Sequence, residues 1–121
     1  MFRRTALIVA ILLTATVTPA VAAPNYVFPV PDCKVNYARA HHDYPATDIL
    51  AKKGCAFVAP IDGVVEDVNL KDIWSSKNNR GQDRGGLSVS IIGIDGVRYY
   101  GSHLISIADG ITPGVNVLAG D

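Results

Sequence analysis

The clearest pattern of apolar and polar residues lies in the second half of the chain. Residues 87–91 (Leu-Ser-Val-Ser-Ile) alternate strictly between the two kinds, which is typical of a strand with one buried face. Asp95 and Gly96 follow, a pair that favours a tight hairpin turn, and residues 97–105 are then expected to form the return strand. The pattern therefore predicts an antiparallel hairpin.

A two-residue turn fixes which side chains of this hairpin share a face. Ile94 is then expected to pair with Val97, and Ser88 to lie opposite His103. Because side chains alternate along a strand, the apolar residues of the hairpin are expected to face the core. The polar, open face is expected to hold Ser88, Ser90, Tyr99 and His103.

Shorter apolar runs, separated by glycine, proline and polar residues, predict further strands. Residues 64–70 are rich in β-branched side chains and follow a sequence typical of a tight turn, Ile61-Asp62-Gly63. The fold class is therefore expected to be mostly β, with a small antiparallel sheet and long loops. Other strand candidates are residues 47–51, 57–59 and 115–118, and the polar residues 75–86 are expected to form a long surface loop.

Composition and charge narrow the class of protein. The chain has 121 residues, with 11 basic and 11 acidic side chains and no run of lysine or arginine. This length fits a single domain, and the balanced charge excludes a nucleic-acid binder held by phosphate contacts. The 11 glycines and 7 prolines suit short strands and turns better than long helices.

Residues 1–22 have the features of a cleavable signal peptide. Arg3 and Arg4 precede an apolar stretch too short to span a membrane, and Ala20-Val21-Ala22 matches a cleavage site. Removal of this segment leaves 99 residues with nine basic and 11 acidic groups. We therefore expect a secreted, extracellular protein with no membrane span after cleavage. Residues 23–39, which contain three prolines, are expected to form an extended lead-in.

Export changes the interpretation of the two cysteines, Cys33 and Cys55. In an oxidising compartment a disulfide between them is the expected state. A metal-binding pair is the competing interpretation, but the spacing of 22 residues does not match a Cys-x-x-Cys motif. A catalytic thiol is a weaker candidate, since it would have to escape oxidation.

Three histidines are the only imidazole groups in the chain. His41 and His42 stand beside Asp43, and Asp48 follows within the same short stretch. Imidazole and carboxylate groups together suit a zinc ion. The alternative is that this stretch is a solvated turn before a proline and that His103 is an ordinary surface histidine.

The order of several short motifs resembles that of the lysostaphin-like zinc metallopeptidases, also called the LytM-type peptidoglycan endopeptidases. The resemblance covers residues 40–121. In that family a ligand histidine is followed by a ligand aspartate, then by an apolar Asp-Gly-Val turn, a central strand, a Tyr-x-x-His-Leu strand and a glycine-valine stretch. The matching segments here are residues 42–49, 58–65, 86–91, 100–104 and 114–121.

This resemblance implies a small antiparallel β-fold, a half-barrel of the duplicated hybrid motif kind. It also implies hydrolysis of peptide bonds in cell-wall peptidoglycan by a secreted, wall-associated and monomeric enzyme. The family pattern makes His42 and Asp48 ligands of Zn²⁺. It makes His103 a catalytic residue that assists the attacking water or steadies the tetrahedral intermediate.

The chain departs from the family pattern in two places. The family spaces its first histidine and aspartate by four positions, whereas His42 and Asp48 are six apart, which leaves His41 as an alternative ligand. The family's third ligand comes from a His-x-His pair, and the chain ends at Asp121 before any such pair. We therefore expect residues 40–121 to be the N-terminal portion of a peptidase domain that is incomplete at its C-terminus. The alternatives are a non-catalytic peptidoglycan-binding or hydrolase-regulating module, and an exported β domain whose histidines are incidental.

Overall fold

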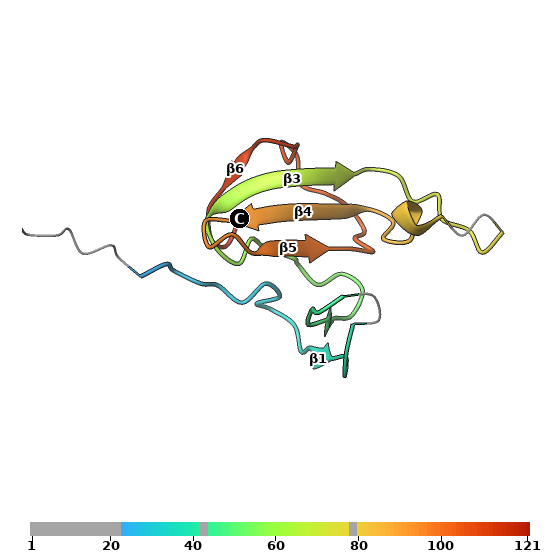
Figure 1. Ribbon diagram of the computed structural model, residues 1–121, viewed down its shortest axis with the longest axis horizontal. Coiled ribbons are helices and arrows are strands. Elements are labelled where there is room, and N and C mark those ends of the chain that lie inside the picture. The colour runs from blue at the N-terminus through green and yellow to red at the C-terminus, as the bar shows by residue number, and fades with distance from the viewer. Residues whose placement is uncertain (1–22, 42–43, 78–79) are drawn as a thin grey trace, which may run out of the picture.

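The computed structural model describes residues 23–41, 44–77 and 80–121, which form two small antiparallel sheets (Figure 1). In these ranges the only helical element is a 3₁₀ turn, η1 (Gly81–Asp83), and no helix is long and apolar enough to cross a membrane. The predicted mostly β, antiparallel fold is confirmed. The larger sheet has the order β5-β4-β3-β6, formed by β3 (Gly63–Asn69), β4 (Ser88–Gly93), β5 (Arg98–Gly101) and β6 (Asn116–Val117).

The central pair of this sheet, β3 and β4, contains a β-bulge. Val65 pairs with Ile91, but the next pair joins Asp67 to Ser90, so Glu66 has no partner of its own across the ladder. An extra residue in one strand shifts the alternation of its side chains by one position. Val65 and Val68 both contact the core for this reason, although they are three residues apart.

One face of the larger sheet covers the hydrophobic core. Val65, Val89 and Ile91 are buried there, together with Ala59 from the preceding segment and Val117 of β6. Burial of such side chains is the main favourable term in folding a domain of this size. The core residues Val89 and Ile91 lie on the face that the alternation of residues 87–91 predicts.

The opposite face of β4 differs from the expected open surface. Ser88 is only 6% exposed and Ser90 only 1% exposed. Ser90 lies beneath Arg98, whose Nη2 donates a hydrogen bond to the serine Oγ at 2.6 Å. The serines are therefore buried on a polar face, covered by longer side chains of the neighbouring strand.

The β4–β5 hairpin has a register one residue away from the predicted one. Ser90 pairs with Tyr100, and the loop has three residues instead of two, because Gly96 adopts a left-handed conformation (φ 76°) and its N–H donates to the Gly93 carbonyl. A shift of one residue exchanges the two faces of a strand. Tyr99 therefore lies against the core, and Tyr100 occupies the polar face.

The return strand is shorter than expected. It ends at Gly101, which is packed so closely against the ring of Phe57 that a Cβ would have no room, and His103 has left-handed backbone (φ 56°). The predicted strand over residues 57–59 is also wrong. Val58 and Ala59 donate backbone hydrogen bonds to Pro29 and Asp121 instead of joining a sheet.

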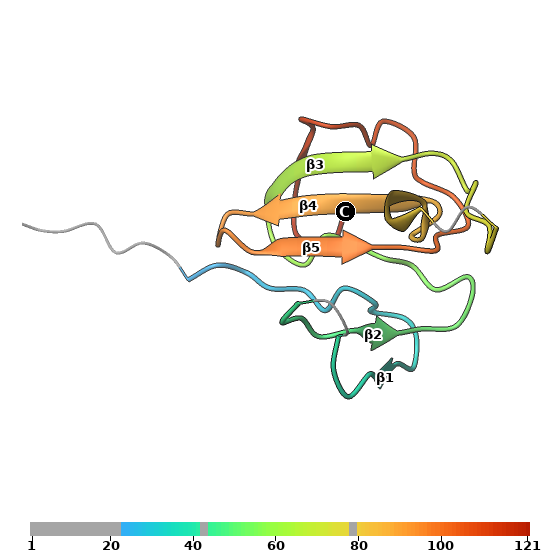
Figure 2. The ribbon, with the colours of Figure 1, turned by 45° about the vertical axis from the view of Figure 1, so that its right-hand side comes forward.

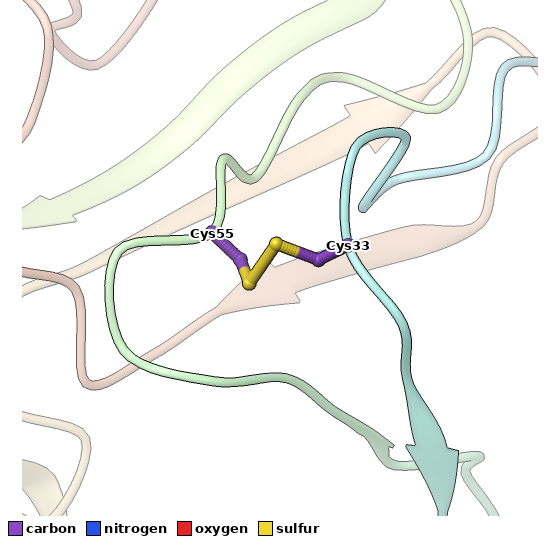
Figure 3. Close-up of a disulfide and its surroundings, with 2 residues drawn as sticks. All are labelled: Cys33 and Cys55. Atoms are coloured by element: carbon purple, nitrogen blue, oxygen red, sulfur yellow. A yellow bond between two sulfur atoms is a disulfide. The ribbon is translucent and has the colours of Figure 1, made fainter.

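The second sheet is a short hairpin of β1 (Asn36–Tyr37) and β2 (Ile49–Leu50), which lies apart from the larger sheet, on the side of β5 (Figure 2). Among the described strands, β1 and β2 contact only each other. The predicted disulfide between Cys33 and Cys55 is confirmed, and it joins the segment before β1 to the segment after β2 (Figure 3). The hairpin is thus enclosed in a covalent ring.

Loss of this disulfide is expected to release the hairpin before it disrupts the larger sheet. The double variant Cys33→Ser/Cys55→Ser should lose about 3 kcal/mol of unfolding free energy, because the unfolded chain is no longer cross-linked. Amide hydrogen exchange should show lost protection in β1 and β2 and retained protection in β3 and β4. Equal loss of protection in both sheets would contradict this account.

The N-terminal segment is fixed to the β4–β5 turn by a shared carboxylate. Asp95 Oδ2 accepts hydrogen bonds from the Tyr26 and Tyr99 hydroxyls at 2.9 and 2.7 Å, and Oδ1 accepts one from the Val97 N–H. The bond from Val97, followed by that from Tyr99, lowers the pKa of Asp95. Burial, together with the bond to Asp95, raises the pKa of Tyr99 to about 12.

The raised pKa of Tyr99 predicts a loss of stability at high pH. The folded protein holds this proton up to a pH of about 12, whereas the unfolded chain releases it near pH 10, so stability should fall as the pH rises between these values. Tyr99→Phe should make this fall shallower in denaturant titrations at several pH values. The control Tyr37→Phe removes an exposed hydroxyl of β1. The prediction would be contradicted if stability fell with pH as steeply in Tyr99→Phe as in this control.

Candidate functional site

The candidate metal-binding stretch forms the loop between β1 and β2. Asp48 immediately precedes β2, and its carbonyl accepts a hydrogen bond from the Ala38 N–H at 3.1 Å, which closes the loop. Asp48 is half-buried. His42, the other predicted ligand, lies outside the described residues. The loop has a wide hollow lined by Arg39, Ala40, His41, Tyr44, Pro45, Ala46 and Thr47.

His41 is held within this loop by Tyr44. The two rings lie 4.1 Å apart between centroids, and the Tyr44 N–H donates to His41 Nδ1 at 3.3 Å. These contacts hold the side chain of His41 against Tyr44. The choice between His41 and His42 as the metal ligand stays a prediction.

Arg98 occupies the centre of the polar face of the larger sheet, and the sequence analysis did not single it out. Its Nε contacts Glu66 at 2.5 Å, and its guanidinium lies 5.3 Å from the centre of the Tyr100 ring. The hydrogen bond to Glu66 raises the pKa of Arg98, and Tyr44 adds to the rise electrostatically. The predicted hairpin register placed Arg98 on the core face of the strand. Only the observed register shows that Arg98 belongs to the polar face.

His103 lies just beyond the end of β5, with its side chain exposed. Its N–H donates to the Gly85 carbonyl at 2.7 Å. Gly85 approaches so closely that a Cβ there would collide with the Tyr100 hydroxyl. His103 is thus positioned at the base of the loop that joins β3 to β4.

The backbone of His103 is in a left-handed conformation that residues other than glycine rarely adopt. It is the only described residue other than glycine with positive φ. The left-handed conformation lowers the stability of the folded state by about 1–2 kcal/mol for an L-residue. Because the imidazole is exposed, core packing does not offset this cost. Such strain is found most often where a side chain has a functional role. The expected exposure of His103 is observed, although its position comes from a turn instead of a strand.

The described residues do not show the predicted site as one assembled group. Asp48 belongs to the β1–β2 loop and His103 to the segment after β5, and within residues 23–41, 44–77 and 80–121 no three His, Cys, Asp or Glu side chains form a group able to hold a metal ion. No protein-family profile, curated protein or solved structure matches this chain.

The strain at His103 can be measured by substitution. His103→Gly should stabilise the protein by about 0.5–1 kcal/mol, because glycine adopts positive φ without the Cβ clash. The matched control is Ser102→Gly, at a neighbouring position without positive φ, which should destabilise by a similar amount. Denaturant unfolding measures both variants, and an equal loss of stability in the two would show that His103 is not strained.

Proposed function

We propose that this protein is an exported zinc metallo-endopeptidase that hydrolyses peptide bonds in bacterial peptidoglycan. The observation that supports this proposal best is the exposed, strained His103, which stands where the family resemblance places a catalytic histidine. The motif order along residues 40–121 supports the same assignment. The Cys33–Cys55 disulfide is compatible with folding in an oxidising compartment, as export requires.

The proposed metal ligands are His42 and Asp48; in the family that the chain resembles, a His-x-His pair supplies the third. Zinc at such a site supplies polarisation of the scissile carbonyl and a lower pKa for its bound water. The described donors alone do not form this site, so the proposal depends on residues outside the described ranges.

His103 is proposed to act directly on the reacting groups. Its imidazole is exposed, so it can reach a peptide bound across the end of the sheet. A neutral imidazole accepts a proton from the attacking water, and the imidazolium so formed donates a hydrogen bond to the developing oxyanion. The hydrogen bond from the His103 N–H to Gly85 fixes the backbone from which the ring projects.

Cleavage of purified cross-linked muropeptides by the naturally exported protein tests this proposal. His103→Ala should lower the turnover rate by roughly 10²-fold or more while the bound zinc stays constant, because the histidine handles protons but is not a ligand. Asp48→Ala should lose both zinc and activity. The control Asp109→Ala removes an exposed carboxylate that has no proposed role in the site, and it should change neither zinc content nor activity.

Two outcomes would contradict the proposal. Cleavage that persists in the presence of a strong chelator would exclude a zinc enzyme, and full activity in His103→Ala would exclude the proposed role of the histidine. Binding to peptidoglycan that is independent of zinc and leads to no cleavage would instead favour the non-catalytic module.

A further inference from the structure

The connection between β3 and β4 contains a group of apolar side chains outside the core. It leaves the sheet after Asn69 and projects beyond the ends of the strands in both views (Figures 1 and 2). Leu70, Ile73 and Trp74 lie within five consecutive residues and are 71%, 56% and 45% exposed. We call these three residues the apolar tip. They flank Lys71 and Asp72, where the connection leaves the sheet. Large exposed apolar side chains this close in sequence are a feature of surfaces that contact another apolar phase.

The charge of this connection is opposite to that of the rest of the protein. Residues 70–86 contain four basic and two acidic side chains, whereas the remainder of residues 23–121 contains five basic and nine acidic ones. Of the two acidic residues, Asp83 is buried and Asp72 packs beside Gly86 at the base of the connection. Lys71, Lys77 and Arg80 are exposed near the apolar tip.

We infer that the apolar tip docks on an anionic lipid surface. Peripheral membrane binding is strongest where exposed apolar groups enter the interface and nearby cations meet negative headgroups. The side chains of Leu70 and Ile73 supply the first feature, and Lys71, Lys77 and Arg80 supply the second. Trp74 has the amphipathic ring that favours the depth of the headgroups.

A sugar chain of the cell wall fits the same residues less well. Stacking on a sugar ring uses the flat face of an aromatic side chain, and here the two aliphatic members of the tip are more exposed than Trp74. Neither Leu70 nor Ile73 offers a hydrogen bond to a hydroxyl group. The excess of positive charge favours a dense anionic surface, which a bilayer rich in acidic lipid provides. This inference does not depend on the proposed peptidase activity.

Trp74 is the only tryptophan of the chain, so its fluorescence reports on the tip directly. Addition of vesicles of phosphatidylglycerol and phosphatidylcholine in equal molar amounts should shift its emission to shorter wavelength, and lipids brominated on their acyl chains should quench it. Pure phosphatidylcholine vesicles should bind much more weakly, and added salt should release the protein from the anionic vesicles.

Variants that retain Trp74 distinguish the contribution of the apolar side chains from that of the cations. Leu70→Ser/Ile73→Ser should weaken vesicle binding by roughly tenfold or more, since both side chains leave water on docking. Lys77→Gln/Arg80→Gln should weaken it by roughly fivefold for each cation removed. The control Ile94→Ser changes an equally exposed apolar residue in the β4–β5 turn, at the other end of the sheet, and should leave binding unchanged.

Three results would overturn the inference. The first is no spectral shift and no co-sedimentation with anionic vesicles. The second is vesicle binding that the Leu70→Ser/Ile73→Ser variant retains in full. The third is a shift caused by purified peptidoglycan sacculi but not by vesicles, which would assign the tip to the cell wall.

Discussion

The Cys33–Cys55 disulfide is the constraint on which the arrangement of the candidate site depends. Among the described strands, β1 and β2 contact only each other, so the packing of strands does not fix their hairpin to the larger sheet. The covalent ring encloses that hairpin and the Asp48 loop, while the bond from Val58 to Pro29 fixes the lead-in beside it. The disulfide closes the hairpin on itself, so a site that combines Asp48 with His103 would join this covalently closed unit to the larger sheet.

The main strands of the sheet could be predicted because their patterns are local. The β-branched run over residues 64–70 and the alternation over residues 87–91 correspond closely to β3 and β4. The hairpin register could not be predicted in the same way, because the Asp-Gly pair fits both two-residue and three-residue loops. The loop length depends on Gly96, whose N–H donates to the Gly93 carbonyl. The three-residue loop places Tyr99 on the core face and Tyr100 on the polar face, the reverse of the prediction.

The candidate site was predictable to a lesser degree, since its geometry depends on long-range contacts. Sequence reasoning selected His103, but the strain of its backbone follows from the bond to Gly85, 18 residues away along the chain. Arg98 was missed because its role on the polar face follows from the position of Ser90 beneath it and from the bulge at Glu66. These features arise where strands meet and leave no periodic pattern in the sequence.

The central claim is that the disulfide-closed hairpin presents metal ligands to a site that includes His103. Elemental analysis of the protein, after dialysis against trace zinc, tests this claim most directly when oxidised and reduced samples are compared. The account predicts one zinc ion per chain in the oxidised protein and clearly lower occupancy after reduction, because the ring that orients Asp48 is then open. An oxidised protein that retains no zinc would contradict the account.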